Sequence, residues 1–94
     1  MIVRIAIHPA GPAGFDYAVS AEGEALYNDA GLGSIMACLA AAIEGLGPEV
    51  KAAELALAGI VSGTYPLHVL ATRPADVIQH AVNTTTAVLQ ALHE

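Results

Sequence analysis

Apolar and polar residues alternate along the first third of the chain, as they do in strands with one buried face. Residues 2–8 read IVRIAIH, so their odd-numbered positions share an apolar face. A Pro- and Gly-rich turn over 9–14 leads into residues 15–20, which alternate again, and 24–28 follow after a second tight turn. This pattern predicts a meander of three antiparallel strands.

The hydrophobic period changes to that of a helix at residue 35. Ser34 can cap the helix because its hydroxyl can accept a hydrogen bond from a free backbone N–H, and Gly47-Pro48 ends the helical pattern. Apolar residues recur at helical spacing from 35 to 46, yet the opposite face is also small and apolar. We therefore predict a helix over 35–44, buried against the sheet and against a partner.

Residues 49–61 are ambiguous. Their alanines, leucines, lysine and glutamates favour a helix, whereas Leu55, Leu57 and Ile60-Val61 could also form a strand. We predict a helix here and keep the strand as the alternative. Residues 67–71 (LHVLA) show too little alternation to have one wet face, so we predict a central strand covered on both sides.

The last helix is predicted to begin at Pro74, whose missing N–H would be unpaired in a first helical turn. Asp76 places a negative charge at the positive end of this helix. Its apolar stripe is formed by Ile78, Ala81, Val82, Thr85, Leu89 and Leu92.

Taken together, the elements predict one α/β (α+β) domain over residues 1–94. It has a three-stranded antiparallel meander, a helix, a possible second helix, a central strand and a C-terminal helix.

The composition changes this picture by predicting self-association. Hydrophobic residues make up 55% of the chain and charged residues only 13%, against about 25% in ordinary soluble domains. Much apolar surface must therefore find cover, and a dimer through an apolar helix face or a sheet edge would supply it. The residues predicted to form this interface are Met36, Leu39, Ile43, Val88 and Leu92.

Several kinds of partner and location are disfavoured. Only three cations, Arg4, Lys51 and Arg73, stand far apart in a chain of net charge -6, which argues against nucleic-acid binding. The apolar stretch 30–43 is too short to cross a bilayer, so no membrane association is expected. The lone Cys38 and the absence of a leader-like start predict a cytoplasmic protein.

Three segments together resemble the ribonuclease H fold. Residues 3–8 with 15–19 resemble its first hairpin, 34–41 resemble its first helix, and 69–79 resemble its fourth-strand motif. The predicted order of elements agrees, and HicB-type antitoxins share a shortened version of this topology. The resemblance implies a ribonuclease H-like mixed sheet.

Catalysis in this family uses two metal ions held by carboxylates. At the corresponding positions this chain has His8, Met36 (or the neighbouring Ile35) and Arg73, so the acids are missing and a cation occupies one metal-ligand position. The resemblance thus implies a degenerate scaffold with no catalytic residue and no cofactor. Relocated acids, namely Asp76, Glu44 and Asp16, are the alternative that would keep a metal-dependent nuclease open.

His8 and His68 are the other candidate metal ligands, because both would lie on neighbouring strands if residues 67–71 were the central strand. No third ligand is visible in the sequence, so we expect two structural core histidines. Cys38 lies in an apolar helix and is expected to behave as a small hydrophobic residue.

The sequence therefore predicts a non-enzymatic protein-interaction or oligomeric accessory module. The alternative is a small acidic inhibitor, antitoxin-like or anti-defence, that binds a basic protein partner. The second alternative is the metal-dependent nuclease.

Overall fold

The computed structural model describes residues 1–12 and 14–93, and this part of the chain folds as an α+β structure, as predicted. Its elements in chain order are β1 (Ile2–Pro9), β2 (Phe15–Ala21), β3 (Glu24–Leu32), α1 (Ile35–Glu44), β4 (Ala52–Leu57), β5 (Ile60–Pro66), α2 (Leu67–Thr72) and α3 (Pro74–Leu92).

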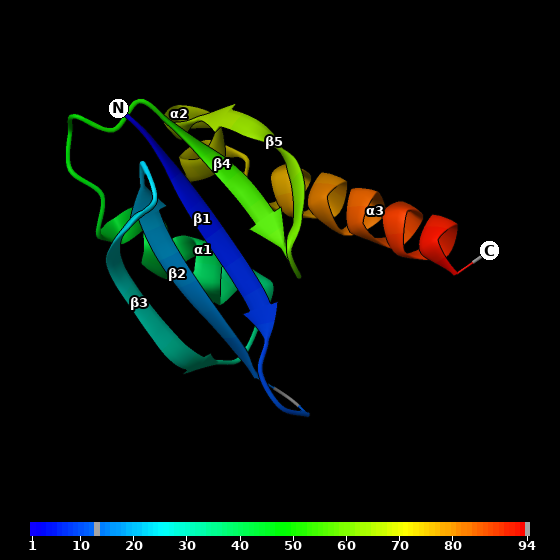
Figure 1. Ribbon diagram of the computed structural model, residues 1–94. Helices are drawn as coiled ribbons and strands as arrows, with labels where there is room; N and C mark the ends of the chain where they lie inside the picture. The colour runs from blue at the N-terminus through cyan, green and yellow to red at the C-terminus, as the bar shows by residue number, and fades with distance from the viewer. Residues whose placement is uncertain (13, 94) are drawn as a thin grey trace.

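The strands form one mixed sheet in the order β3-β2-β1-β4-β5 (Figure 1). β1 lies at the centre, antiparallel to β2 and parallel to β4, while β3 and β5 form the two edges. Val3, Ile5 and Ile7 of β1 point to one face and are buried, as the alternation predicted. The predicted meander of β1, β2 and β3 is confirmed.

The helices cover only one face of this sheet (Figure 1). α1 packs against the meander, and α3 packs against β4 and β5. The Ser34 hydroxyl accepts a hydrogen bond from the Ala37 N–H at 3.0 Å, which confirms the predicted cap of α1. Tyr27 of β3 ties this helix to the sheet by donating its hydroxyl proton to the Ala42 carbonyl. Within the part of the chain that the structure describes, the opposite face of the sheet carries no helix.

The helix predicted for residues 49–61 is wrong, because this segment contains β4 and the start of β5. Ala58 and Gly59 join these strands with φ angles of 53° and 82°, the pair of positive values that a tight two-residue hairpin turn uses. Pairing with β1 outweighs the helix propensity of this Ala-rich stretch, since Ala53, Leu55 and Leu57 become buried against the helices.

The central strand predicted for residues 67–71 is also wrong, because these residues form the short helix α2. The place beside β1 is taken by β4, and Pro66 ends β5 instead of starting a strand. Leu70 is the only buried residue of α2, so the apolar run is not covered on both sides. A short apolar run does not distinguish a strand from a buried helix by its pattern alone.

Candidate functional site

The last two turns of α3 extend beyond the sheet (Figure 1). We call residues 86–92 the overhang: each of them is exposed, whereas Val77, Ala81 and Thr85 earlier in the helix are buried. Val88, Leu89 and Leu92 continue the spacing of the buried residues at intervals of three and four, and Leu92 is 73% exposed. The apolar face of α3 therefore extends past the surface that covers it.

A second apolar surface lies at the other end of α3. It is a groove of about 250 Å³ lined by Met36, Ala40, Ile43 and Glu44 of α1, Leu70 and Ala71 of α2, and Pro74 of α3. Leu70 is fully buried at this site, and Met36 is 39% exposed. Glu44 is the only charged side chain among the lining residues. The groove is thus suited to hold apolar side chains.

These two surfaces contain four of the five predicted interface residues. Val88 and Leu92 lie on the overhang, while Met36 and the half-buried Ile43 line the groove. The fifth, Leu39, is wrong as an interface residue, because it is 0% exposed in the core. Leu39 points into the core, because the packing of α1 against the sheet determines which side of the helix faces inward.

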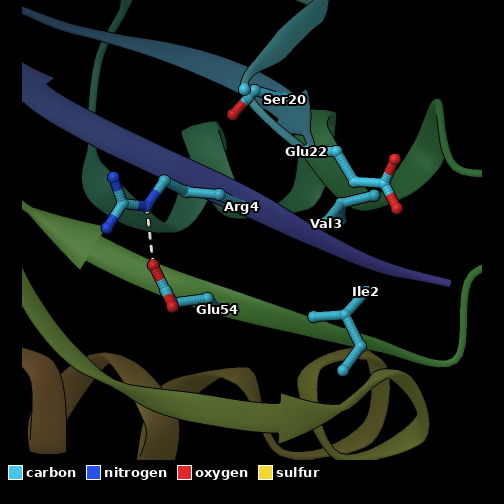
Figure 2. Close-up of a pocket in the computed structure, with 7 residues that line it drawn as sticks. Ile2, Val3, Arg4, Ser20, Glu22 and Glu54 are labelled. Atoms are coloured by element: carbon cyan, nitrogen blue, oxygen red, sulfur yellow. Dashed lines mark hydrogen bonds and ion pairs between the residues drawn. The ribbon is translucent and has the colours of Figure 1, made fainter.

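The helix-free face of the sheet has a different character. Arg4 of β1 lies between Ser20 of β2 and Glu54 of β4, and its Nε donates to the Glu54 carboxylate at 2.6 Å (Figure 2). A hollow of about 260 Å³ opens beside this pair, with Glu22 on its other side. Its two carboxylates outnumber its one guanidinium, which is already paired, so the hollow does not attract an anion.

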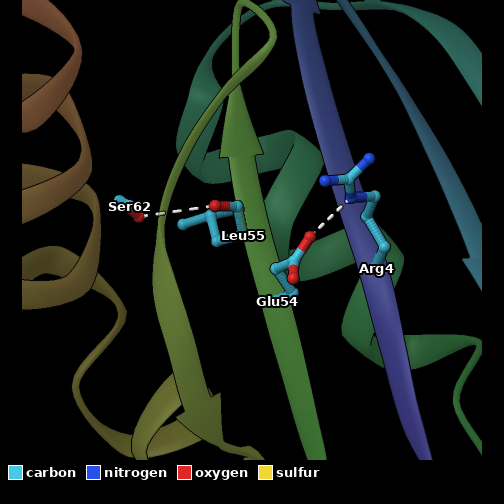
Figure 3. A network of polar contacts seen from close by, with 4 residues as sticks. All are labelled: Arg4, Glu54, Leu55 and Ser62. Carbon is cyan, nitrogen blue, oxygen red and sulfur yellow. Dashed lines mark hydrogen bonds and ion pairs between the residues drawn. The ribbon is translucent and has the colours of Figure 1, made fainter. Parts of the chain in front are cut away.

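Beside the ion pair, a row of small side chains crosses the same face. Ala18, Ala6 and Ala56 are register partners on β2, β1 and β4. On the other face the Ser62 hydroxyl of β5 donates to the Leu55 carbonyl at 3.5 Å (Figure 3). The same hydroxyl lies 3.0 Å from the Tyr65 hydroxyl. The Arg4–Glu54 and Ser62 contacts tie β1, β4 and β5 together.

His8 and His68 are not neighbours, so the predicted histidine pair is wrong. His8 lies near the end of β1 and His68 on α2, and both are exposed, not packed in the core. The reason is the misplaced central strand, since residue 68 lies in a helix. Within residues 1–12 and 14–93, no three His, Cys, Asp or Glu side chains are placed to hold a metal ion.

The positions that correspond to the ribonuclease H acids lie in different places. His8 lines a hollow on β1, β2 and β3 together with Asp16 and Asp29. Met36 lines the apolar groove. Next to the groove, Arg73 donates a hydrogen bond from its Nε to the Asp76 carboxylate at 3.1 Å. The relocated acids do not gather either: Asp16 lies in the hollow of His8, Glu44 in the groove, and Asp76 in its ion pair with Arg73.

The Cys38 thiol is shielded from solvent. Cys38 is fully buried on α1, and desolvation raises its pKa, with the negative charges of Asp16 and Asp29 acting in the same direction. Burial likewise raises the pKa of Tyr17, with Asp29 adding to the effect, and raises the pKa of Tyr27. These groups remain protonated near neutral pH, so the thiol behaves as the small hydrophobic residue predicted.

Comparison of the chain with protein-family models, curated proteins and solved structures found no match. None of the helices in the described part of the chain has the length and apolar character needed to span a bilayer.

Proposed function

We propose that this protein is a non-enzymatic interaction module that works as a homodimer. The observation that carries the proposal is the overhang, where α3 continues its apolar stripe through Val88, Leu89 and Leu92, which are 37%, 42% and 73% exposed. Each square ångström of apolar surface removed from water contributes about 25 cal/mol, so covering this stripe favours association.

The charge distribution supports a second copy of the chain as the partner. The chain has net charge -6, which makes most approaches between two copies repulsive. Residues 77–93 contain no Asp, Glu, Lys or Arg, so the overhang belongs to the longest part of α3 without such repulsion. Two copies can therefore approach most easily there.

Two elements of the proposal rest on the sequence alone. The ribonuclease H-like scaffold is inferred from residues 3–8 with 15–19 and from residues 34–41 only, because residues 69–79 fall in helices α2 and α3 instead of a strand. The cytoplasmic location is inferred from the single cysteine, which cannot form an internal disulfide.

The test is light scattering coupled to size exclusion, at micromolar protein concentration and two salt concentrations. The wild type should elute as a dimer at both salt concentrations, and Leu92→Lys should raise the dissociation constant at least about tenfold, as expected for loss of a central apolar contact. Gln90→Lys is the matched control, because Gln90 is exposed on the overhang but lies about 200° around the helix from Leu92. A monomeric wild type, or equal loss in both variants, would refute the proposal.

A second candidate function is supported by the β2–β3 hairpin. This segment carries Asp16, Glu22, Glu24 and Asp29 without any Lys or Arg, and β3 has a free edge. An acidic edge of this kind suits an inhibitor of a basic protein, because opposite charges accelerate association. This second function predicts that the protein binds a basic partner and that the binding weakens as the salt concentration rises. Binding that does not depend on salt would contradict it.

A further inference from the structure

The overhang and the groove occupy opposite ends of α3, and both are apolar. We propose that they bind each other between two copies of the chain, so that the overhang of each protomer lies in the groove of the other. This inference rests on the proposed dimer and specifies how its two protomers are joined.

The length of α3 excludes docking within one chain. From Pro74 to Leu92 the helix rises by about 27 Å, at about 1.5 Å per residue. Since Pro74 lines the groove, the overhang is held a full helix length from the groove of its own protomer. Only another molecule can bring an overhang to this groove.

The two surfaces match in size and chemistry. An engineered cavity of about 150 Å³ holds one benzene-sized group, so a groove of about 250 Å³ has room for one or two leucine side chains. Glu44 is the one carboxylate of the groove, and His93, which directly follows the overhang, has an imidazole N–H that can donate a hydrogen bond to it. Residues 86–93 contain no carboxylate, and the nearest one in the sequence is Glu94.

Reciprocal exchange also doubles the area that one docked overhang buries. Two turns of one helix face bury far less than the roughly 800 Å² per partner of an ordinary stable interface. When each protomer gives an overhang and receives one, every contact is made twice around a two-fold axis. Such an arrangement closes at two copies, whereas one-way docking would continue into a chain of molecules.

The test is site-specific crosslinking with a short bismaleimide, which joins two accessible thiols. A His93→Cys protein is mixed with a size-tagged Glu44→Cys protein; both changes keep the apolar residues of the overhang and of the groove. The native Cys38 is fully buried, so it does not compete. The matched control replaces Glu44→Cys with Glu24→Cys, an exposed glutamate on the edge strand β3.

We expect at least tenfold more crosslinked heterodimer from His93→Cys with Glu44→Cys than from the control pair. Met36→Lys should in addition convert the dimer to a monomer, because it places a charge in the groove. Three results would overturn the inference: equal crosslinking in both pairs, a dominant His93→Cys homodimer, which would show overhang packed on overhang, or growth beyond a dimer with concentration. Each of them is distinct from a monomeric wild type, which would refute the proposed dimer itself.

Discussion

The two halves of α3 have the same apolar periodicity and opposite surroundings. In the first half Val77, Ala81 and Thr85 are buried beneath β4 and β5, while in the overhang Val88, Leu89 and Leu92 are exposed. The pattern of a helix thus shows which face would be buried but not how far the rest of the fold extends to cover it. Where the cover ends, an apolar stripe becomes a surface available for association.

The largest effect should come from introducing the same charge into both halves. Ala81 is 1% exposed, so Ala81→Lys forces a charge and a long side chain into a packed site and should cost about 3 kcal/mol or more in the free energy of unfolding. Ala87→Lys, in the overhang, should change the free energy of unfolding by less than about 0.5 kcal/mol, because Ala87 is exposed. Urea unfolding of the two variants measures the difference, and similar losses would mean that the overhang is packed within its own protomer.

Hydrogen exchange should show a smaller difference between the halves. When the Leu92→Lys variant is diluted below its dissociation constant, amides of the last turn of α3 should exchange within about tenfold of the rate of an unstructured chain, because helix ends without packing fray. Amides in the first half should be protected by the stability of the whole fold. In the wild-type dimer, the amides of the last turn should be more protected. Unchanged exchange there would mean that the overhang is not part of the dimer interface.

The smallest effect concerns Thr85, the last buried residue of the first half before the overhang. Its hydroxyl oxygen is buried and has no hydrogen-bond partner among the described residues. Thr85→Val replaces it with a methyl group of the same shape and should stabilise the protein by about 1 kcal/mol. Thr86→Val is the control, because Thr86 is the next residue and is exposed, so this change should have almost no effect on the thermal unfolding midpoint. If both variants raised the midpoint equally, the cause would be helix propensity and not the buried hydroxyl.

The regions that sequence reasoning predicted correctly are those with local signals. Alternation defined β1, β2 and β3, and Ser34 marked the start of α1. The β4–β5 hairpin was missed because its residues favour a helix locally, and pairing with β1 decides their state. The signal that could have revealed it is Ala58-Gly59, a turn pair weakened by an alanine in the position where glycine or asparagine is usual.

The candidate site was predictable in part. The stripe that reaches Leu92 and the exposure of Met36 follow from helical spacing and an apolar composition. The groove could not be foreseen, because it depends on α2, which was predicted as a strand. Leu39 is a second example. The sequence predicted an apolar helix here, but which of its residues face the core depends on how the helix packs against the sheet.

The parallel pairing of β1 with β4 has a consequence for the order of folding. Arg4 and Glu54 are partners across the centre of the sheet although 50 residues separate them in the chain. Hairpins close within microseconds, but contacts of such long range are slow to form. Until β4 arrives, the inner edge of β1 has unpaired N–H and C=O groups, which can pair with another nascent chain. During synthesis, the central strand is therefore the part of this protein most in need of protection.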